Sequence, residues 1–383
     1  MNAAPGSTVD APGGLTGLAA RYATRTSAAL QRAAGGAPVV GVVGRDVPAA
    51  LVAAAGGEPF RVPPRERAAA EVAVAAEHLG GAVDRAALLV AAAVLAGELD
   101  PLRGLLIAHD GEGSVRLHAV LHELHRRGRT TLPVHLVDQV HLPRESTVRF
   151  NVQQVLSMLR TVEAWTGGAV DEGSLADAWA QQQRTTAVLR DLHDRRPHPA
   201  GPGGTVALHA YGLAAGAPGA EALPAIEAAL ARPVPRRADG LPLWLTGSAP
   251  VGDDLYRLLE SAGAVVVGED HDWGDPVLTD APAGPAPRTR EAAAEVAVRA
   301  RLVGAPAAAT STMAARAAAT AAGVARTGAR ALLAVVREHD DAPAWDYSRQ
   351  RAAAGVPAAL VRGAAADDPQ AVLDALAVLR RSA

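Results

Sequence analysis

The sequence has 383 residues, 49% of them hydrophobic, with 38 glycines and 27 prolines, which is the composition of a globular protein of roughly two or three domains. The net charge of −3 provides no basic surplus, so we expect neither nucleic acid nor a membrane as a partner. All 37 basic residues are arginine and there is no cysteine, which excludes a lysine Schiff base, disulfides, thiolate nucleophiles and cysteine-ligated metal centres.

The N-terminal segment is small, polar and rich in proline and glycine. We expect residues 1–14 to form a disordered tail. The segment has no apolar core of a signal peptide, and no stretch of the chain approaches the roughly 18 uncharged apolar residues of a membrane span. These features favour a cytoplasmic protein.

The first half of the chain alternates between helical and strand patterns. A helix is predicted over residues 15–34, followed by the buried strand PVVGVVG, a helix from about residue 48 to 55, and a short strand. LRGLLIAHD, a helix containing HAVLHELHRR, and LPVHLVDQ continue the alternation, which is typical of a parallel α/β unit. Residues 147–195 lack strand patterns and predict two long helices.

A second α/β unit is predicted after the proline- and glycine-rich segment at 195–204, which reads as a linker. Its strand candidates are LPLWLTGS, AVVVGEDHD, ALLAVVREHD and VPAALVRG. We therefore expect an α/β fold of two Rossmann-like parallel-sheet domains facing a cleft, with a helical insertion. The N-terminal domain would span 15–200, with the helical segment 147–195 inside it, and the C-terminal domain would span 201–383.

Three apolar runs end in the same dipeptide, at His109-Asp110, His271-Asp272 and His339-Asp340. Ligands bind at the carboxyl ends of strands in open parallel sheets, so each imidazole would lie at the functional edge. Three histidines and an open position suit catalytic zinc or non-haem iron. The alternative is that the His-Asp pair has only a structural role in the loop after the strand, where the aspartate caps the next helix.

Other residues could bind a substrate. Thr246, Gly247 and Ser248 follow a predicted strand and could contact a phosphate, a carboxylate or an acyl thioester, although strand-to-helix junctions use such residues structurally. Arg45, in GVVGRD, could contact an anion, and His141 could join a site after a strand. The dinucleotide fingerprint and the nucleophile elbow of hydrolases are absent.

In order and pattern, these segments resemble the D-component family of 2-hydroxyacyl-CoA dehydratases, which includes benzoyl-CoA reductase subunits. The similar segments are VVGVVGRDVPAALVAAAGGEPFRV, GELDPLRGLLIAHDGEGSVRL, LPLWLTGSAPVGDDLYRLLESAGAVVVGEDHDWGDP and REHDDAPAWDYSRQRAAAGVPAALVRG. The resemblance covers most of the chain. It implies two α/β lobes, an acyl-CoA substrate and a related partner subunit.

The chain departs from that family at its redox centre. The resemblance places the three cluster-binding cysteines of the family at His109, His271 and His339, so neither a [4Fe–4S] cluster nor its radical chemistry is expected. For the same reason no ATP-driven electron donor is expected as a partner. A mononuclear divalent metal, Zn or Fe(II), on these histidines would be the natural replacement.

From these observations we predict a metal-dependent lyase that catalyses dehydration, hydration or elimination. Its substrate would be a small acyl or hydroxy-acid compound, with acyl-CoA among the candidates. Asp110 and Asp272 would transfer protons. Two alternatives remain open: a non-catalytic structural partner subunit and a metal-carrying protein. We expect a homodimer or a heterodimer with a related subunit.

Overall fold

The computed structural model describes residues 14–231, 240–278 and 283–383, and in these ranges the chain forms two separate four-stranded sheets in which every strand pair is parallel. The first sheet consists of β1 (Val39–Val43), β2 (Glu58–Arg61), β3 (Leu105–Ala108) and β4 (Val134–Val137). The second consists of β5 (Leu241–Gly247), β6 (Ala264–Glu269), β7 (Ala331–Val336) and β8 (Ala358–Arg362). The predicted fold class is confirmed. The predicted tail lies outside the described residues except for Gly14.

The two sheets share one topology. Their strand orders are β2-β1-β3-β4 and β6-β5-β7-β8, so the chain reverses direction across the sheet between β1 and β3 and again between β5 and β7. Such switch points open a crevice at the carboxyl ends of the strands, which is where open α/β sheets bind ligands.

Helices cover both faces of the first sheet because its central strands, β1 and β3, are apolar on both sides. Leu105 and Ile107 of β3 face one apolar core, and Leu106 and Ala108 face the other, as the two-residue period of a strand requires. The helices around this sheet are α1 (Leu15–Ala34), α2 (Ala49–Ala54), α3 (Ala69–Leu79), α4 (Arg85–Leu95), α5 (Glu112–Arg126) and α6 (Glu145–Thr166). The first core contains residues of α1, α3, α4 and α5, and the second contains residues of α2 and α6.

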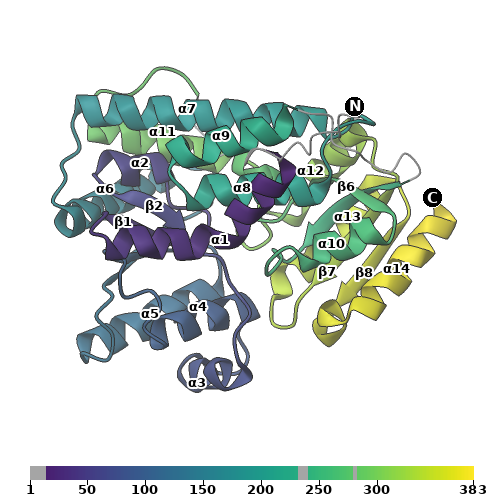
Figure 1. Ribbon diagram of the computed structural model, residues 1–383, viewed down its shortest axis with the longest axis horizontal. Helices are drawn as coiled ribbons and strands as arrows, with labels where there is room; N and C mark the ends of the chain where they lie inside the picture. The colour runs from purple at the N-terminus through teal and green to yellow at the C-terminus, as the bar shows by residue number, and fades with distance from the viewer. Residues whose placement is uncertain (1–13, 232–239, 279–282) are drawn as a thin grey trace, which may run out of the picture.

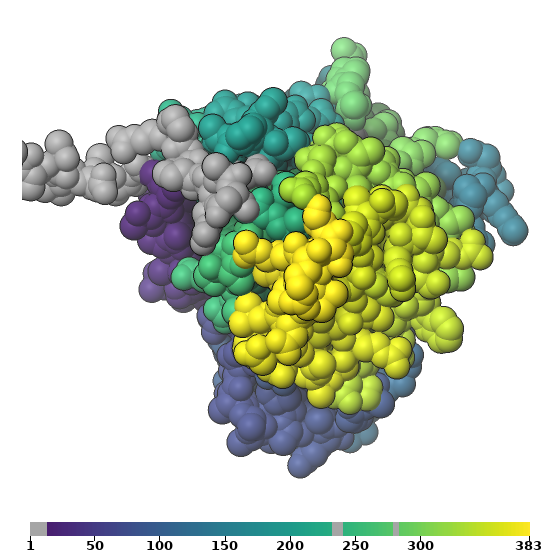
Figure 2. Space-filling model, turned by 90° about the vertical axis from the view of Figure 1, so that its right-hand side faces the viewer, coloured from purple at the N-terminus to yellow at the C-terminus, as the bar shows by residue number. Residues whose placement is uncertain are grey.

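The second sheet is covered in the same way. Its helices are α10 (Asp254–Ser261), α12 (Met313–Thr327), α13 (Asp341–Ala354) and α14 (Pro369–Ser382), and two short 3-10 helices follow strands, η1 (Asp275–Leu278) and η2 (Gly363–Asp367). Residues of α10 and α14 pack against Leu243 and Leu333, whereas residues of α12 and α13 pack on the face that carries Trp244. Figure 2 views this unit from outside, with α14 in yellow.

A layer of helices joins the two sheets. It contains α7 (Glu172–Arg195), α8 (Gly204–Gly216) and α9 (Gly219–Leu230), which share an apolar core with α1. Helix α8 contacts both β2 and β6, and lies between the sheets in Figure 1. Helix α11 (Arg290–Val303) packs on α6 and on the core of the first sheet.

The chain therefore crosses between the units more than once. The segment predicted as a linker, 195–204, is the connection between α7 and α8, and the two long helices predicted over 147–195 are present as α6 and α7. However, α8, α9 and α11, all from the second predicted domain, pack on helices of the first. None of the described helices is long and apolar enough to cross a membrane.

Candidate functional site

The switch point of the first sheet is held together by Asp110, which follows β3. Its Oδ2 accepts a hydrogen bond from the backbone N–H of Arg45 (3.0 Å), and its Oδ1 accepts one from Ser114 Oγ (2.7 Å). Gly44 lies between β1 and Arg45 with φ +90°, and a Cβ there would lie 2.3 Å from Asp110 Oδ2. Only glycine allows this close approach.

The electrostatic surroundings of Asp110 favour its protonated form. Burial and, after it, the nearby carboxylates of Asp46 and Asp272 raise the pKa of Asp110 to about 6, against the opposing effect of its hydrogen bonds from Ser114 and Arg45. A carboxyl group in this range can hold or release a proton near neutral pH.

The second switch point repeats this arrangement. Ser248, after β5, donates from Oγ to Asp340 Oδ2 (2.5 Å) and accepts the backbone N–H of Arg337 (3.0 Å). Burial and the carboxylate of Asp84 raise the pKa of Asp340 to about 6. The ion pair between Arg337 and Asp84 (3.1 Å) then ties the loop after β7 to the helices of the first sheet.

The two units meet at Asp272, in the turn after β6. Arg45 Nη1 lies 3.6 Å from Asp272 Oδ1, and Arg61 Nη1 donates to the Asp272 carbonyl oxygen (2.6 Å). The Arg61 guanidinium also stacks 4.2 Å over the Trp273 ring. Burial raises the pKa of Asp272, but the surrounding arginines outweigh it and lower the pKa, so this carboxyl group is ionised.

A fully buried carboxylate, Asp46, lies beside this junction. Its Oδ1 accepts from Arg301 Nε (2.5 Å), its Oδ2 lies 2.7 Å from His141 Nε2, and its carbonyl accepts from Gln139 Nε2 (2.6 Å). Although burial opposes ionisation, His141 and Arg301 lower the pKa of Asp46 to about 2. Asp46 therefore fixes the position of the Arg301 guanidinium.

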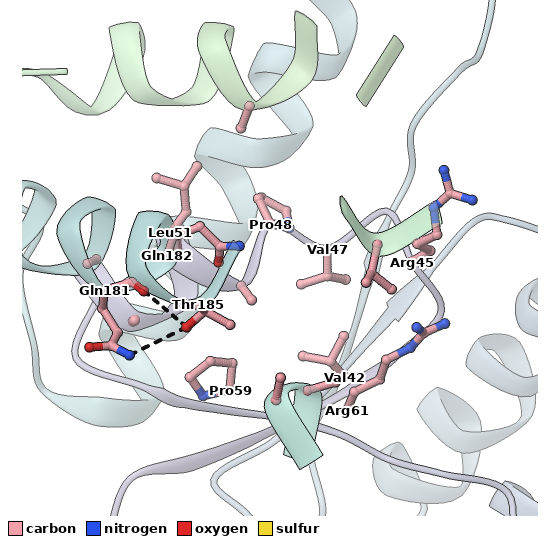
Figure 3. A pocket seen from close by; sticks show the side chains of 18 of the residues that line it. Val42, Arg45, Val47, Pro48, Leu51, Pro59, Arg61, Gln181, Gln182 and Thr185 are labelled. Atoms are coloured by element: carbon pink, nitrogen blue, oxygen red, sulfur yellow. Dashed lines mark hydrogen bonds between the residues drawn. The ribbon is translucent and has the colours of Figure 1, made fainter. Parts of the chain in front are cut away.

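A cavity of about 460 Å³ opens next to these charges (Figure 3). It is bounded by the ends of β1 and β2, by α2, and by the helices α7, α8, α9 and α11; no strand of the second sheet is among its described walls. Arg45 and Arg61 lie at one end, and Gln181, Gln182 and Thr185 of α7 lie at the other. Apolar side chains line most of the space between, among them Pro48, Leu51, Pro59, Val155, Ala178 and Leu189.

Of the three predicted ligand histidines, His271 is buried with both ring nitrogens in use. Its Nδ1 accepts the backbone N–H of Trp273 (3.3 Å), so Nε2 carries the proton and bonds to Tyr256 Oη at 2.6 Å. Burial lowers the pKa of His271 to about 4. This ring has no lone pair left for a metal.

The other two histidines are exposed. His109 Nδ1 lies 2.6 Å from Asp138 Oδ1, and His339 has a left-handed backbone with φ 62°. Across the described ranges, no three or more His, Cys, Asp or Glu side chains are arranged to hold a metal ion. A cysteine-bound [4Fe–4S] cluster does not fit either, because the chain has no thiolate to offer.

Of the four predicted substrate-binding residues, only Arg45 lines the cavity. Thr246 accepts a hydrogen bond from Gln350 Nε2 (3.1 Å) inside the second unit. Gly247 lies so close to Val335 that a Cβ would be 2.2 Å from its carbonyl oxygen, and Ser248 is engaged as described above. These three residues hold the loop after β5 in place.

Sequence reasoning missed Asp46, Arg61 and Arg301. Asp46 was adjacent to Arg45 in the GVVGRD motif, and its position after a buried strand was a usable signal. Arg301 lies in α11, 255 residues from Asp46, and nothing in its local sequence distinguished it from the exposed Arg299.

A comparison with protein families identifies this architecture. Residues 46–318, more than two thirds of the chain, match the model of the family described as 2-hydroxyglutaryl-CoA dehydratase, D-component. No curated protein matches the chain at the threshold applied. The matched range contains the Asp272 turn and all described walls of the cavity except Val42, Gly44 and Arg45. The chain belongs to the 2-hydroxyglutaryl-CoA dehydratase D-component family.

Proposed function

We propose that this chain is a cluster-free member of the dehydratase family that binds a small acyl or hydroxy-acid compound in the cavity beside β1 and β2, and that it acts there as a lyase. The observation that carries the proposal is the cavity itself. It is large enough for a small organic ligand, mainly apolar, and runs along β2 to the residues that follow β1 at the switch point.

The chemistry would be loss or addition of water. Loss of water from a hydroxy acid breaks one C–H and one C–O bond, so it needs a base for the proton and an acid for the departing hydroxyl. Asp110 and Asp272 stay our candidates for these roles. Neither lines the cavity itself, but Asp110 accepts the backbone N–H of Arg45 and Asp272 lies 3.6 Å from the Arg45 guanidinium, and Arg45 lines the cavity.

The proposed divalent metal on His109, His271 and His339 stays a prediction. Binding would require His271 to give up its bond to Tyr256 or to the backbone of Trp273, and the two exposed rings to move toward it. No step of the proposed chemistry is assigned to a metal.

The proposal is tested by screening free 2-hydroxy acids, 2-enoic acids and their CoA thioesters for an increase in melting temperature. Compounds that bind are then incubated with the protein in D₂O, and proton NMR follows deuterium incorporation and the interconversion of hydroxy and enoic acids. We expect binding in the wild type, and turnover that is lost in Asp110→Asn and Asp272→Asn but kept in Asp177→Asn, an exposed residue of α7. Binding without turnover in any condition contradicts the lyase assignment.

The second candidate is a non-catalytic partner subunit of a dehydratase-like complex. It is favoured by the absence of every cysteine that could bind the family's cluster. The same screen separates the candidates: a partner subunit would bind none of the compounds and would form a stable complex with a cysteine-containing member of the family, seen by size-exclusion chromatography with light scattering.

A further inference from the structure

Arg301 is a buried cation with an unused hydrogen-bond donor. Its side chain is only 8% exposed and it lines the cavity. Its Nε donates to Asp46, but its buried Nη2 has no hydrogen-bond partner among the described residues. An unpaired buried donor on a charged group is costly, so this nitrogen is placed to bind an acceptor that enters the cavity.

The end of the cavity that contains Arg301 carries a positive surplus. The charges that act most strongly on the carboxylate of Asp272 are Arg45, Arg61, Arg301 and Asp46. Three guanidinium groups against the carboxylates of Asp46 and Asp272 leave one positive charge, which the nearby Asp110 offsets only in its ionised form. In a partly buried region such a charge is screened little by water and favours a bound anion.

The remainder of the cavity is different in character. Its middle is walled by Pro48, Leu51 and Pro59, and its far end by the amides of Gln181 and Gln182 (Figure 3). Gln181 Nε2 donates to Thr185 Oγ1 at 3.4 Å and Gln181 Oε1 accepts from the exposed Arg184 at 2.6 Å, so the groups of α7 that line this end, two amides and a hydroxyl, are neutral. A ligand that matches the walls would have an anionic head, an apolar body and a neutral or small polar tail.

We propose that Arg301, supported by Arg45 and Arg61, binds the carboxylate or phosphate head of a small amphiphilic anion whose apolar body lies along α2 and β2. This inference rests on the proposed function and deepens it, because it requires an anionic group on the ligand itself and sets its orientation. Asp46 is the positioning residue, since it holds the Arg301 guanidinium through Nε and leaves Nη2 free for the ligand.

The test uses three six-carbon probes: hexanoate, its neutral isostere hexanamide, and hexyl phosphate. Isothermal titration calorimetry is carried out at pH 7 on the wild type, Arg301→Gln and Arg299→Gln. Arg299 lies on the same helix but is exposed and paired with Glu145, so it controls for the loss of one positive charge. The relative affinities of hexanoate and hexyl phosphate show which head the site prefers.

We expect hexanoate or hexyl phosphate to bind the wild type at least tenfold more tightly than hexanamide. Arg301→Gln should weaken the preferred anion by roughly ten- to a hundredfold and leave hexanamide unchanged, whereas Arg299→Gln should change neither. The anion site is overturned if hexanamide binds as tightly as both anions, or if Arg301→Gln and Arg299→Gln lose the same affinity for the anion. Either result still leaves the cavity as a ligand site. If no probe binds, the cavity itself is not a ligand site and the proposed function fails with it.

Discussion

The Asp110 side chain offers the sharpest test of the electrostatics at the junction. Its pKa is about 6 in the folded protein against the ordinary value of 3.8, so the folded state holds the proton more tightly than the unfolded state. The contribution of Asp110 to the free energy of unfolding is therefore complete below about pH 4 and is lost as the pH rises through about 6. A shift of about two units corresponds to roughly 3 kcal/mol at pH 7 and above.

Replacing Asp110 by asparagine removes the free-energy cost of ionising this carboxyl group and keeps its hydrogen bonds. The amide oxygen can still accept the N–H of Arg45, and the amide nitrogen can donate to Ser114 Oγ. Asp110→Asn should thus be more stable than the wild type by up to about 3 kcal/mol at pH 8, with the gain disappearing by pH 4. Urea unfolding at pH 4, 6 and 8 measures this, with Asp177→Asn as the exposed control. A gain that is the same at every pH, or a loss at pH 8, would refute the reasoning.

Three further predictions concern residues around the junction. Gly44→Ala would force an L residue to φ +90° and place its Cβ 2.3 Å from a carboxylate oxygen, so we expect it to lower the free energy of unfolding by about 3 kcal/mol or more in urea titrations. Arg196→Met would leave the buried Glu269 and Asp275 without their cation (2.6 Å in each pair) and should cost about 3–5 kcal/mol, much of which returns when both acids are also made neutral amides. His271 has a pKa lowered to about 4, so its ring ¹⁵N shifts should stay constant from pH 5.5 to 8 in the absence of metal, and a change on addition of Zn²⁺ is the result that the predicted metal site requires.

The fold was predictable because its strands carry a local signal. VVGVV and ALLAVV are β-branched or apolar throughout and are followed by glycine or charged residues, as expected of strands buried on both faces. The alternation with helices then implied parallel sheets. The packing of α11 on α6 was not predictable, because its apolar face carries mostly alanine and gives no sign of which core it joins.

The candidate site was only partly predictable, because a local sequence pattern shows which residues follow a strand but not which distant residues they contact. The sequence placed Arg45, Asp110 and Asp272 after strands, and in the structure the three residues are in contact there. The sequence could not show that His271 turns inward to Tyr256, since a contact between a turn and a neighbouring helix has no local signature. Nor could it show that Arg301 reaches Asp46 from another part of the chain.

The central claim is that the cavity binds a small organic ligand, and a cavity-filling substitution tests it most directly. Ala178 lines the cavity, whereas Ala180 on the same helix is exposed, so Ala178→Phe and Ala180→Phe form a matched pair. Hexanoate is titrated calorimetrically into the wild type and both variants, whose folding is checked by circular dichroism. The account predicts that hexanoate binds the wild type and Ala180→Phe equally and does not bind a folded Ala178→Phe. Undiminished binding to Ala178→Phe, or no binding to any of the three, would contradict it.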